Sequence, residues 1–260
     1  MNFSRVYAIV LRHYFLAHHQ IERIFDIFFF PVFALVVWGF LSQYVAYIQS
    51  STLAAFLLGG IILWIIFERV GTDIGISFMF DIWERNIINV LSTPLTFLEY
   101  LTGLVLISIF KILISFVAMW LVAGLFYDFQ IMSLGLPLAL FFINLIIFAA
   151  SFGLFNISMV LRFGHSIGPL TWILPFCLQP FVAVFYPISV LPPALQNVSY
   201  FIPISYVFEG MRQVISTGSF NTELFWKAFG LNILYFALSV TFFAFILKIV
   251  LKSGRLVKLT

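Results

Sequence analysis

Six long apolar runs, separated by shorter segments that contain charged, polar or proline residues, dominate the pattern of this chain. An apolar helix needs about 20 residues to cross a bilayer, and each run reaches that length. The pattern therefore predicts an all-α integral membrane protein with six transmembrane helices. We place these spans at about 24–45, 52–71, 100–126, 134–161, 167–190 and 224–251.

The six spans form one domain over residues 1–260, because no polar linker is long enough to separate two domains. An amphipathic segment at 1–23 precedes the first two spans, which lie within 24–78. A polar segment at 79–99 leads to three spans within 100–190. An interrupted segment at 191–223, the last span at 224–251 and a tail at 252–260 complete the chain.

Residues 1–23 show helical amphipathicity without the length of an uninterrupted span. Basic side chains recur at seven-residue spacing and aromatic or aliphatic ones fall mostly on another face: Arg5, Arg12 and His19 against Phe3, Val6, Tyr7, Val10 and Tyr14. A helix with these two faces lies in the headgroup plane of a membrane. We expect an interfacial helix here, and a frayed cytoplasmic tail is the structural alternative.

The polar segment from Asp81 to Glu99 stands between two apolar runs. It contains four residues suited to an interface with water or protein, namely Trp83, Glu84, Arg85 and Asn86. Apolar positions at 87–91 predict a short helix, which Pro94 ends because the residue before proline is driven out of helical geometry. A short rigid helix could dock on a soluble protein and pass movement into the neighbouring spans. An ordinary connecting loop is the alternative.

The next helix has two possible start points, and only one of them can be correct. Thr93 can cap a helix with Pro94 at its first position. Alternatively, Thr96 and Glu99 can form a capping box.

The segment before the last span is too apolar for a plain loop and too interrupted to cross. Its prolines, Pro187, Pro192, Pro193 and Pro203, forbid a continuous helix. Short helices that enter the outer leaflet and return are compatible with this pattern where protein covers the backbone. Glu209 and Arg212 are spaced to pair on one helical face. A local ion pair or a contact with substrate would both explain them.

Composition supports the membrane assignment, because only 9% of residues are charged and 63% are hydrophobic. Soluble domains carry about 25% charged residues. Lys and Arg gather in the flanks on one side of the predicted spans, while the loops at 42–51 and 128–133 contain neither. The positive-inside rule therefore places both termini and the 79–99 segment in the cytoplasm.

The sequence contains none of the common catalytic motifs. It has no Gly-x4-Gly-Lys-Ser/Thr sequence, no Gly-x-Ser-x-Gly sequence, no His-Glu-x2-His sequence and no obvious carboxylate cluster within the predicted spans. We therefore expect neither enzymatic activity nor a bound metal or cofactor, and no nucleic-acid partner. Lys111 is nearly alone among ionisable residues near mid-membrane, where a lipid-facing lysine costs about 2.5–3.5 kcal/mol. It should face protein, either in an interhelical hydrogen bond or in contact with an anionic substrate group.

Two motifs resemble those of one family. The pattern Trp83-Glu84-Arg85-Asn86-x3-Val90-Leu91-x2-Pro94-x4-Glu99 lies between the second and third spans. The pattern Tyr186-Pro187-Ile188-Ser189, followed by Pro203-x5-Glu209-Gly210-x-Arg212, precedes the last span. Their joint placement resembles ABC-2 type permeases, the membrane subunits of type V ATP-binding-cassette exporters.

The resemblance implies a permease in a bacterial inner membrane that exports an amphipathic or lipid-linked substrate. It further implies a homodimer, or a heterodimer with a similar permease, joined to ATPase subunits that bind ATP and Mg. Residues 79–99 would then be the coupling segment, with Trp83, Glu84, Arg85, Asn86, Pro94 and Glu99 at the ATPase, and the proline-rich segment with Glu209 and Arg212 would form the outer gate. Lys111 and Gln179 are possible polar residues of the path. A drug, a lipid, a glycolipid and a polysaccharide all remain possible substrates.

Two other functions compete with this hypothesis. One is a secondary transporter or a lipid-handling membrane protein without an ATPase partner, and the secondary transporter would need paired ionisable residues for ion coupling. An intramembrane enzyme would need converging His, Asp, Glu or Ser side chains, and the sequence reveals no such set.

Overall fold

A computed structural model describes residues 1–19, 21–84 and 86–253 of the chain. Helices account for almost all of these residues. The α-helices are α1 (Phe3–His19), α2 (Ile21–Ile48), α3 (Ser51–Trp83), α4 (Ile87–Ser92), α5 (Phe97–Tyr127), α6 (Leu136–Phe163), α7 (Gly168–Leu178), α8 (Pro193–Tyr200), α9 (Pro203–Thr217) and α10 (Thr222–Lys252). The short 3-10 helices are η1 (Ile131–Leu134), η2 (Gly164–Ile167), η3 (Gln179–Phe181) and η4 (Ile188–Val190).

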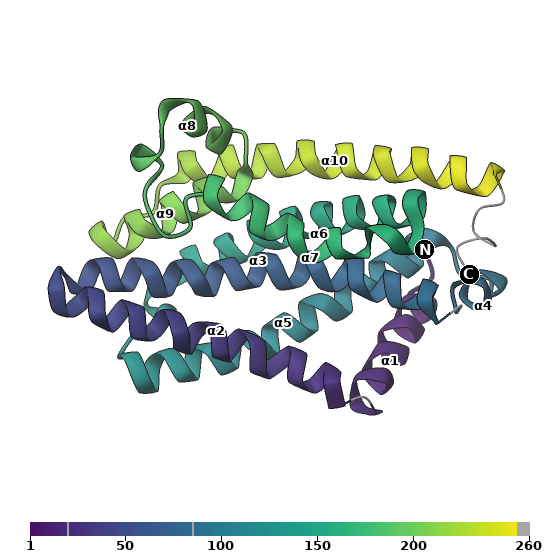
Figure 1. Cartoon of the computed structure of the whole chain (residues 1–260), viewed down its shortest axis with the longest axis horizontal. Coiled ribbons are helices and arrows are strands. Elements are labelled where there is room, and N and C mark those ends of the chain that lie inside the picture. The colour runs from purple at the N-terminus through teal and green to yellow at the C-terminus, as the bar shows by residue number, and fades with distance from the viewer. Residues whose placement is uncertain (20, 85, 254–260) are drawn as a thin grey trace.

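Five helices form an elongated bundle whose axes run roughly along the long dimension of the molecule (Figure 1). Among the described residues, α2, α3, α5, α6 and α10 are long and apolar enough to cross a membrane. They correspond to five of the six predicted spans. The chain is therefore an all-helical, multi-pass membrane protein.

The predicted span at 167–190 is not one continuous helix. Only α7 is regular α-helix, and its 11 residues rise about 16 Å, roughly half the hydrocarbon thickness. Pro175 lies inside α7 and Pro180 is the second residue after its end, so backbone hydrogen bonds are lost where a long helix would need them. The chain nevertheless continues along α3: a Cβ on Gly168 would lie 3.0 Å from Met79, and one on Gly60 would lie 2.6 Å from the carbonyl oxygen of Val184.

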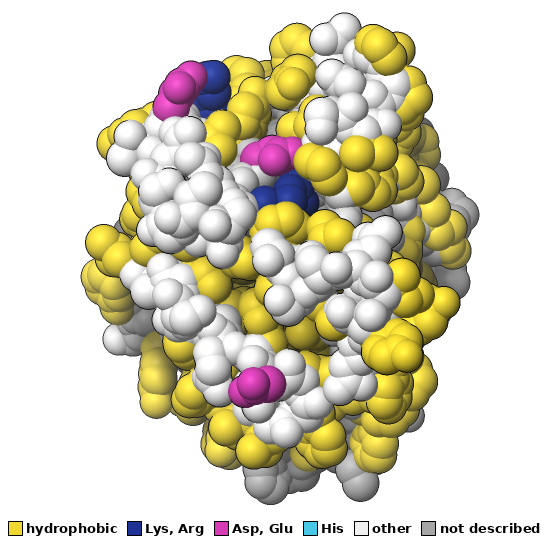
Figure 2. Space-filling model, turned by 90° about the vertical axis from the view of Figure 1, so that its left-hand side faces the viewer, with side chains coloured by type: hydrophobic (Ala, Val, Ile, Leu, Met, Phe, Trp, Pro, Cys, Tyr) yellow, Lys and Arg dark blue, Asp and Glu magenta, His cyan; other side chains and the backbone are white. Residues whose placement is uncertain are grey.

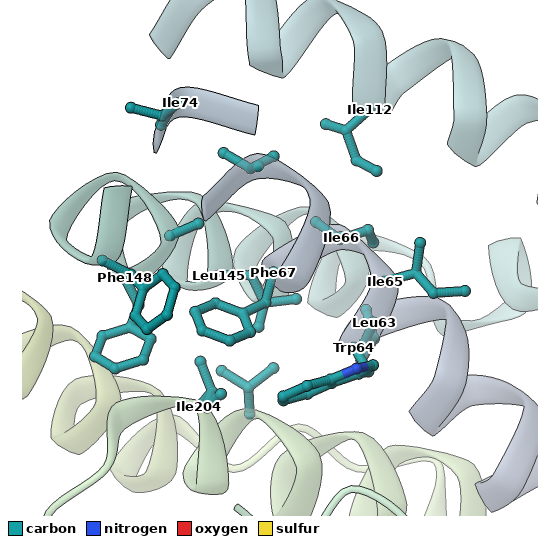
Figure 3. Packing of buried hydrophobic residues seen from close by; sticks show 14 of the residues in the cluster. Leu63, Trp64, Ile65, Ile66, Phe67, Ile74, Ile112, Leu145, Phe148 and Ile204 are labelled. Carbon is teal, nitrogen blue, oxygen red and sulfur yellow. The ribbon is translucent and has the colours of Figure 1, made fainter. Parts of the chain in front are cut away.

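Helix α3 is the centre of the hydrophobic core. Figure 3 shows Trp64, Phe67 and their neighbours on α3 packed against Leu145 and Phe148 of α6 and Ile204 of α9. Small residues let the α3 and α6 backbones approach, since a Cβ on Gly153 would lie 2.7 Å from Ile74. α3 is also longer than predicted. It continues to Trp83, so 79–83 is the last part of a helix and not the start of a separate segment.

α1 and α4 lie together at one end of the bundle, at the right of Figure 1, where α10 also ends. The expected short helix before Pro94 is confirmed as α4, and Thr93 has the extended geometry typical of a residue before proline. Of the two start points predicted for the next helix, the Thr96–Glu99 capping box is correct. α8 and α9 cover the opposite end of the bundle.

Candidate functional site

Asp81, in the last turn of α3, is the centre of a buried polar network. Its side chain is almost fully buried and forms a two-pronged ion pair with Arg12 of α1, in which Arg12 Nη1 lies 3.1 Å from Oδ2. The Tyr100 hydroxyl of α5 donates to Oδ2 at 2.5 Å, and the Asn86 amide donates to Oδ1 at 3.2 Å. One carboxylate thus joins α1, α3, α5 and the turn that leads into α4.

Glu99, in the first turn of α5, forms a second link to α1. Its carboxylate accepts hydrogen bonds from the backbone N–H of Asn2 at 2.7 Å and of Thr96 at 2.9 Å. Arg5 lies 3.5 Å away as an ion-pair partner. Together with Asp81, Glu99 therefore attaches both halves of α1 to the spans.

The residues predicted to contact an ATPase have different environments. Glu84 and Pro94 are exposed on either side of α4, whereas Asn86 points toward Asp81. Trp83 is half-buried at the end of α3, with its ring 5.5 Å from that of Phe80. Arg85 lies outside the described residues.

A cavity of about 410 Å³ separates α4 from α1. Its lining includes Arg5 and Arg12 from α1 and Asn86, Asn89 and Pro94 from the α4 region. Ile87 and Val90 are buried beneath α4, while Asn89 is exposed. The α4 region therefore combines an apolar attachment to the bundle with a polar outer surface.

His13 is buried in the face of α1 that packs on the bundle. Neither ring nitrogen has a hydrogen-bond partner among the described residues. Burial and, to a smaller extent, the positive charges of Lys111 and Arg12 together lower the pKa of His13 from 6.5 to about 4. The imidazole is consequently neutral near pH 7.

Lys111 is not alone within the spans, and that expectation from the sequence was wrong. Its Nζ lies 2.7 Å from Asp73 Oδ1 on α3, and the Ser108 hydroxyl donates to the other carboxylate oxygen at 2.5 Å. Asp26, Glu68 and Arg69 line the same cavity, so the expected absence of a carboxylate cluster was also wrong. Asp73 was overlooked because we predicted that the second span ends before it.

The proline-rich segment builds the opposite end of the bundle. Pro187 precedes η4, Pro192 precedes α8, and Pro193 and Pro203 occupy the first turns of α8 and α9. Proline is compatible with a first turn because the N–H it lacks has no intrahelical partner there. The breaks therefore lie where the prolines predict them.

The predicted Glu209–Arg212 contact is present, with Arg212 Nη2 3.1 Å from Glu209 Oε1. Arg212 also donates to the carbonyl oxygen of Ala183 at 2.8 Å, and Glu209 accepts from the N–H of Ile188 at 2.7 Å. This pair thus attaches α9 to the irregular 183–188 stretch, where Ala183 has a positive φ of 56°.

Figure 2 shows this end of the molecule, which carries few charged side chains and is hollowed beside a neighbouring cation and carboxylate. Glu209 and Arg212 line a cavity of about 700 Å³ at this end. Gln179 is half-buried in η3 and is not among the residues that line this cavity.

The family model described as ABC-2 type transporter matches residues 9–216. The chain belongs to the ABC-2 type transporter family. This ABC-2 permease is thus a component of a membrane transport system, and permeases of this family normally work with an ATPase partner. A comparison with curated proteins gave no match.

The ABC-2 match begins in α1 and ends near the end of α9. It therefore includes the Asp81 network, the cavity around Lys111 and the proline-rich segment. Arg12, Asp81 and Tyr100 were not predicted as site residues, although Arg12 and Asp81 were visible as charges beside apolar runs. Arg12 and Asp81 pair although they lie 69 residues apart in the chain, and this pairing has no local sequence signal.

Proposed function

We propose that this ABC-2 permease is the transmembrane subunit of an ATP-driven exporter, with ATP hydrolysed by a separate subunit that docks on the α4 region. The exported molecule is amphipathic or lipid-linked and leaves the cytoplasm or the inner leaflet. Two copies of the permease form the membrane part of the complex in a bacterial inner membrane. ATP and Mg belong to the partner, since this sequence has no Gly-x4-Gly-Lys-Ser/Thr loop to hold the phosphates.

One observation carries the coupling role: Asn86, the residue directly before α4, is joined through the buried Asp81 carboxylate to α1, α3 and α5. The Asp81 carboxylate holds Arg12, Tyr100 and Asn86 at hydrogen-bond distance. A force applied to the exposed side of α4 would reach α1, α3 and α5 through contacts whose geometry is defined by charge-assisted hydrogen bonds. The permease region nearest the ATPase would thus move as a unit.

Six crossings are part of the proposal, and they require the broken segment to serve as the fifth. Its path supports this role, because Gly168 adjoins Trp83 at one end of α3 and Val184 adjoins Gly60 in the other half. An even number of crossings places both ends of the chain on one side. The basic flanking residues, among them Arg5, Arg12, Arg162 and Lys252, make that side the cytoplasm. α8 and α9 then form the outer gate as re-entrant helices.

Site-directed photocrosslinking tests the docking surface. A photoreactive residue at Asn89, on the exposed side of α4, should crosslink in cells to a protein with a P-loop ATPase sequence, identified by mass spectrometry. The matched control carries the same residue at Phe201, which is 69% exposed at the other end of the bundle. Crosslinks to the ATPase from Phe201 but not Asn89, or from neither site, would contradict the proposal.

A secondary transporter is the second candidate, because α3 and α5 contribute an ionisable pair at membrane depth. The Asp73–Lys111 pair is the kind of buried group that can couple ion and substrate movement. Uptake into inside-out vesicles separates the two mechanisms. Uptake by the ATP-driven exporter requires ATP and continues when the ion gradients are collapsed. Uptake by a secondary transporter requires an ion gradient and continues without ATP.

A further inference from the structure

A second cavity, of about 320 Å³, lies among α2, α3, α5 and α7. This volume is at the lower end of the range for small-molecule sites, which is about 300–1,000 Å³. A drug-sized ligand bound here would therefore extend beyond the cavity. The lining combines charged groups with aromatic rings: Asp26, Glu68, Arg69, Asp73, Lys111, Phe30, Trp172 and Phe176. None of these residues is among those proposed to contact the ATPase.

The charges in this cavity are unbalanced. Three carboxylates face two cations, which leaves one surplus negative charge among the described residues. Lys111 Nζ forms an ion pair with Asp73 at 2.7 Å, and the shortest ion-pair distance of Arg69 is to Asp26, also 2.7 Å.

Glu68 is the carboxylate with the weakest partner. Its nearest cation atom is Arg69 Nε at 3.5 Å, and its carboxylate accepts no hydrogen bond from the described residues. Only 18% of the side chain is exposed. A half-buried carboxylate without a close partner favours a cationic ligand beside Glu68 over an anionic one.

The aromatic rings supply the second half of the recognition. Phe30, Trp172 and Phe176 are 51%, 42% and 59% exposed, so their surfaces remain available to a ligand. The Arg69 guanidinium already lies over the Phe30 ring, 5.2 Å from its centroid. Ring faces attract cations, and aromatic side chains are the usual means of binding quaternary ammonium groups.

We infer that this cavity binds monovalent organic cations with an apolar body. The positive centre lies beside Glu68 and the apolar groups lie against Trp172 and Phe176. That such cations are the exported substrates rests on the proposed function, whereas the binding itself needs neither ATP nor a partner.

Equilibrium dialysis of the purified full-length protein with radiolabelled tetraphenylphosphonium tests the binding. Tetraphenylborate has the same shape and the opposite charge, so it should compete poorly. Glu68→Gln keeps the size of the side chain and removes the surplus charge, and it should weaken tetraphenylphosphonium binding by at least about tenfold. Glu223→Gln, the same substitution at an exposed site on α10, should leave binding unchanged.

A second pair of variants tests the aromatic contact without altering charge. Trp172→Leu should weaken binding by roughly two- to thirtyfold, and Trp172→Phe should retain most of it. Size-exclusion chromatography of each variant verifies that it is folded. Equal binding of the phosphonium to Glu68→Gln and to the unaltered protein, or equal competition by tetraphenylborate, would overturn the inference.

The result of this binding test can be distinguished from the result of the test of the proposed function. Charge-dependent binding together with no ATPase crosslink from α4 would retain this site and refute the exporter. An ATPase crosslink together with charge-independent binding would retain the exporter and refute this site.

Discussion

Replacing Asp81 with Asn is the sharpest test of the network that joins α1 to the spans. The substitution preserves the shape of the side chain and removes its negative charge. Arg12 would then lose its ion-pair partner, and Tyr100 and Asn86 would lose a charged acceptor. Because α1 is attached to the bundle by this carboxylate and by Glu99, we expect α1 to detach more often.

The expected magnitude follows from the burial of the pair. Only 3% of the Asp81 side chain and 25% of the Arg12 side chain are exposed. Breaking a buried ion pair by removing one partner costs about 3–5 kcal/mol. Since Arg12 retains some contact with solvent, the cost should lie near the lower end, about 3 kcal/mol. A change of that size raises the population of detached α1 by about 100-fold.

Cysteine labelling measures this population. Cys177 is exposed and would be replaced by Ser, after which Val6→Cys supplies a single thiol in the buried face of α1. A maleimide reaches this thiol only when α1 detaches, so the labelling rate follows the detached population if reattachment is fast. Asp81→Asn should raise the rate by about 100-fold.

Two controls define what would refute the reasoning. Asp128→Asn makes the same chemical change at an exposed residue with left-handed geometry, which Asn tolerates, and should leave labelling unchanged. Adding Arg12→Leu to Asp81→Asn removes the unpaired cation and should restore part of the protection. A labelling rate for Asp81→Asn within about threefold of the unaltered protein would show that the pair does not hold α1.

Three further predictions concern the same interface. Burial and the charges of Lys111 and Arg12 depress the pKa of His13 from 6.5 to about 4, so its neutral form stabilises docked α1 above pH 6.5. This stability, about 3 kcal/mol in total, is lost as the pH falls toward 4. The labelling rate of Val6→Cys, divided by that of a free thiol at the same pH, should therefore rise as the pH falls, and His13→Leu should flatten that rise. Gly103→Leu should displace α1 and accelerate labelling, because even a Cβ there would lie 2.6 Å from Ile9. Its control lies outside this interface: Gly230→Ala on α10 meets nothing within 4 Å and should raise the melting temperature slightly. Glu99→Gln weakens the acceptor for the Asn2 and Thr96 N–H groups and should increase labelling less than Asp81→Asn does. An equal or larger increase would show that Glu99 is the main attachment of α1.

Much of the fold was predictable because bilayer thickness imposes a length on apolar helices. Five of the predicted spans match α2, α3, α5, α6 and α10. Local backbone chemistry likewise located α4 before Pro94 and the breaks at Pro187, Pro192 and Pro203. These features depend on residues close together in the chain, so they are visible in the sequence.

The end of α3 shows where that reasoning stops. We predicted that the second span ends near residue 71, but α3 continues past Asp73 and Asp81, and both are compensated by partners on other helices. A charge inside a span is compatible with a helix when packing supplies the opposite charge. The sequence contains both members of each pair and does not show that they meet.

The sequence by itself thus determined a multi-pass helical protein, the position of the short helix α4 and the broken outer segment, since apolar length, proline and local capping act within one stretch of chain. Only the tertiary structure decided that Arg12 joins Asp81, that Lys111 joins Asp73, and that Glu68 remains poorly paired beside exposed aromatic rings. These relations depend on the packing of helices distant in sequence. The physical reason is that hydrophobic periodicity selects which helices form, whereas the balance of charges between them depends on which faces meet.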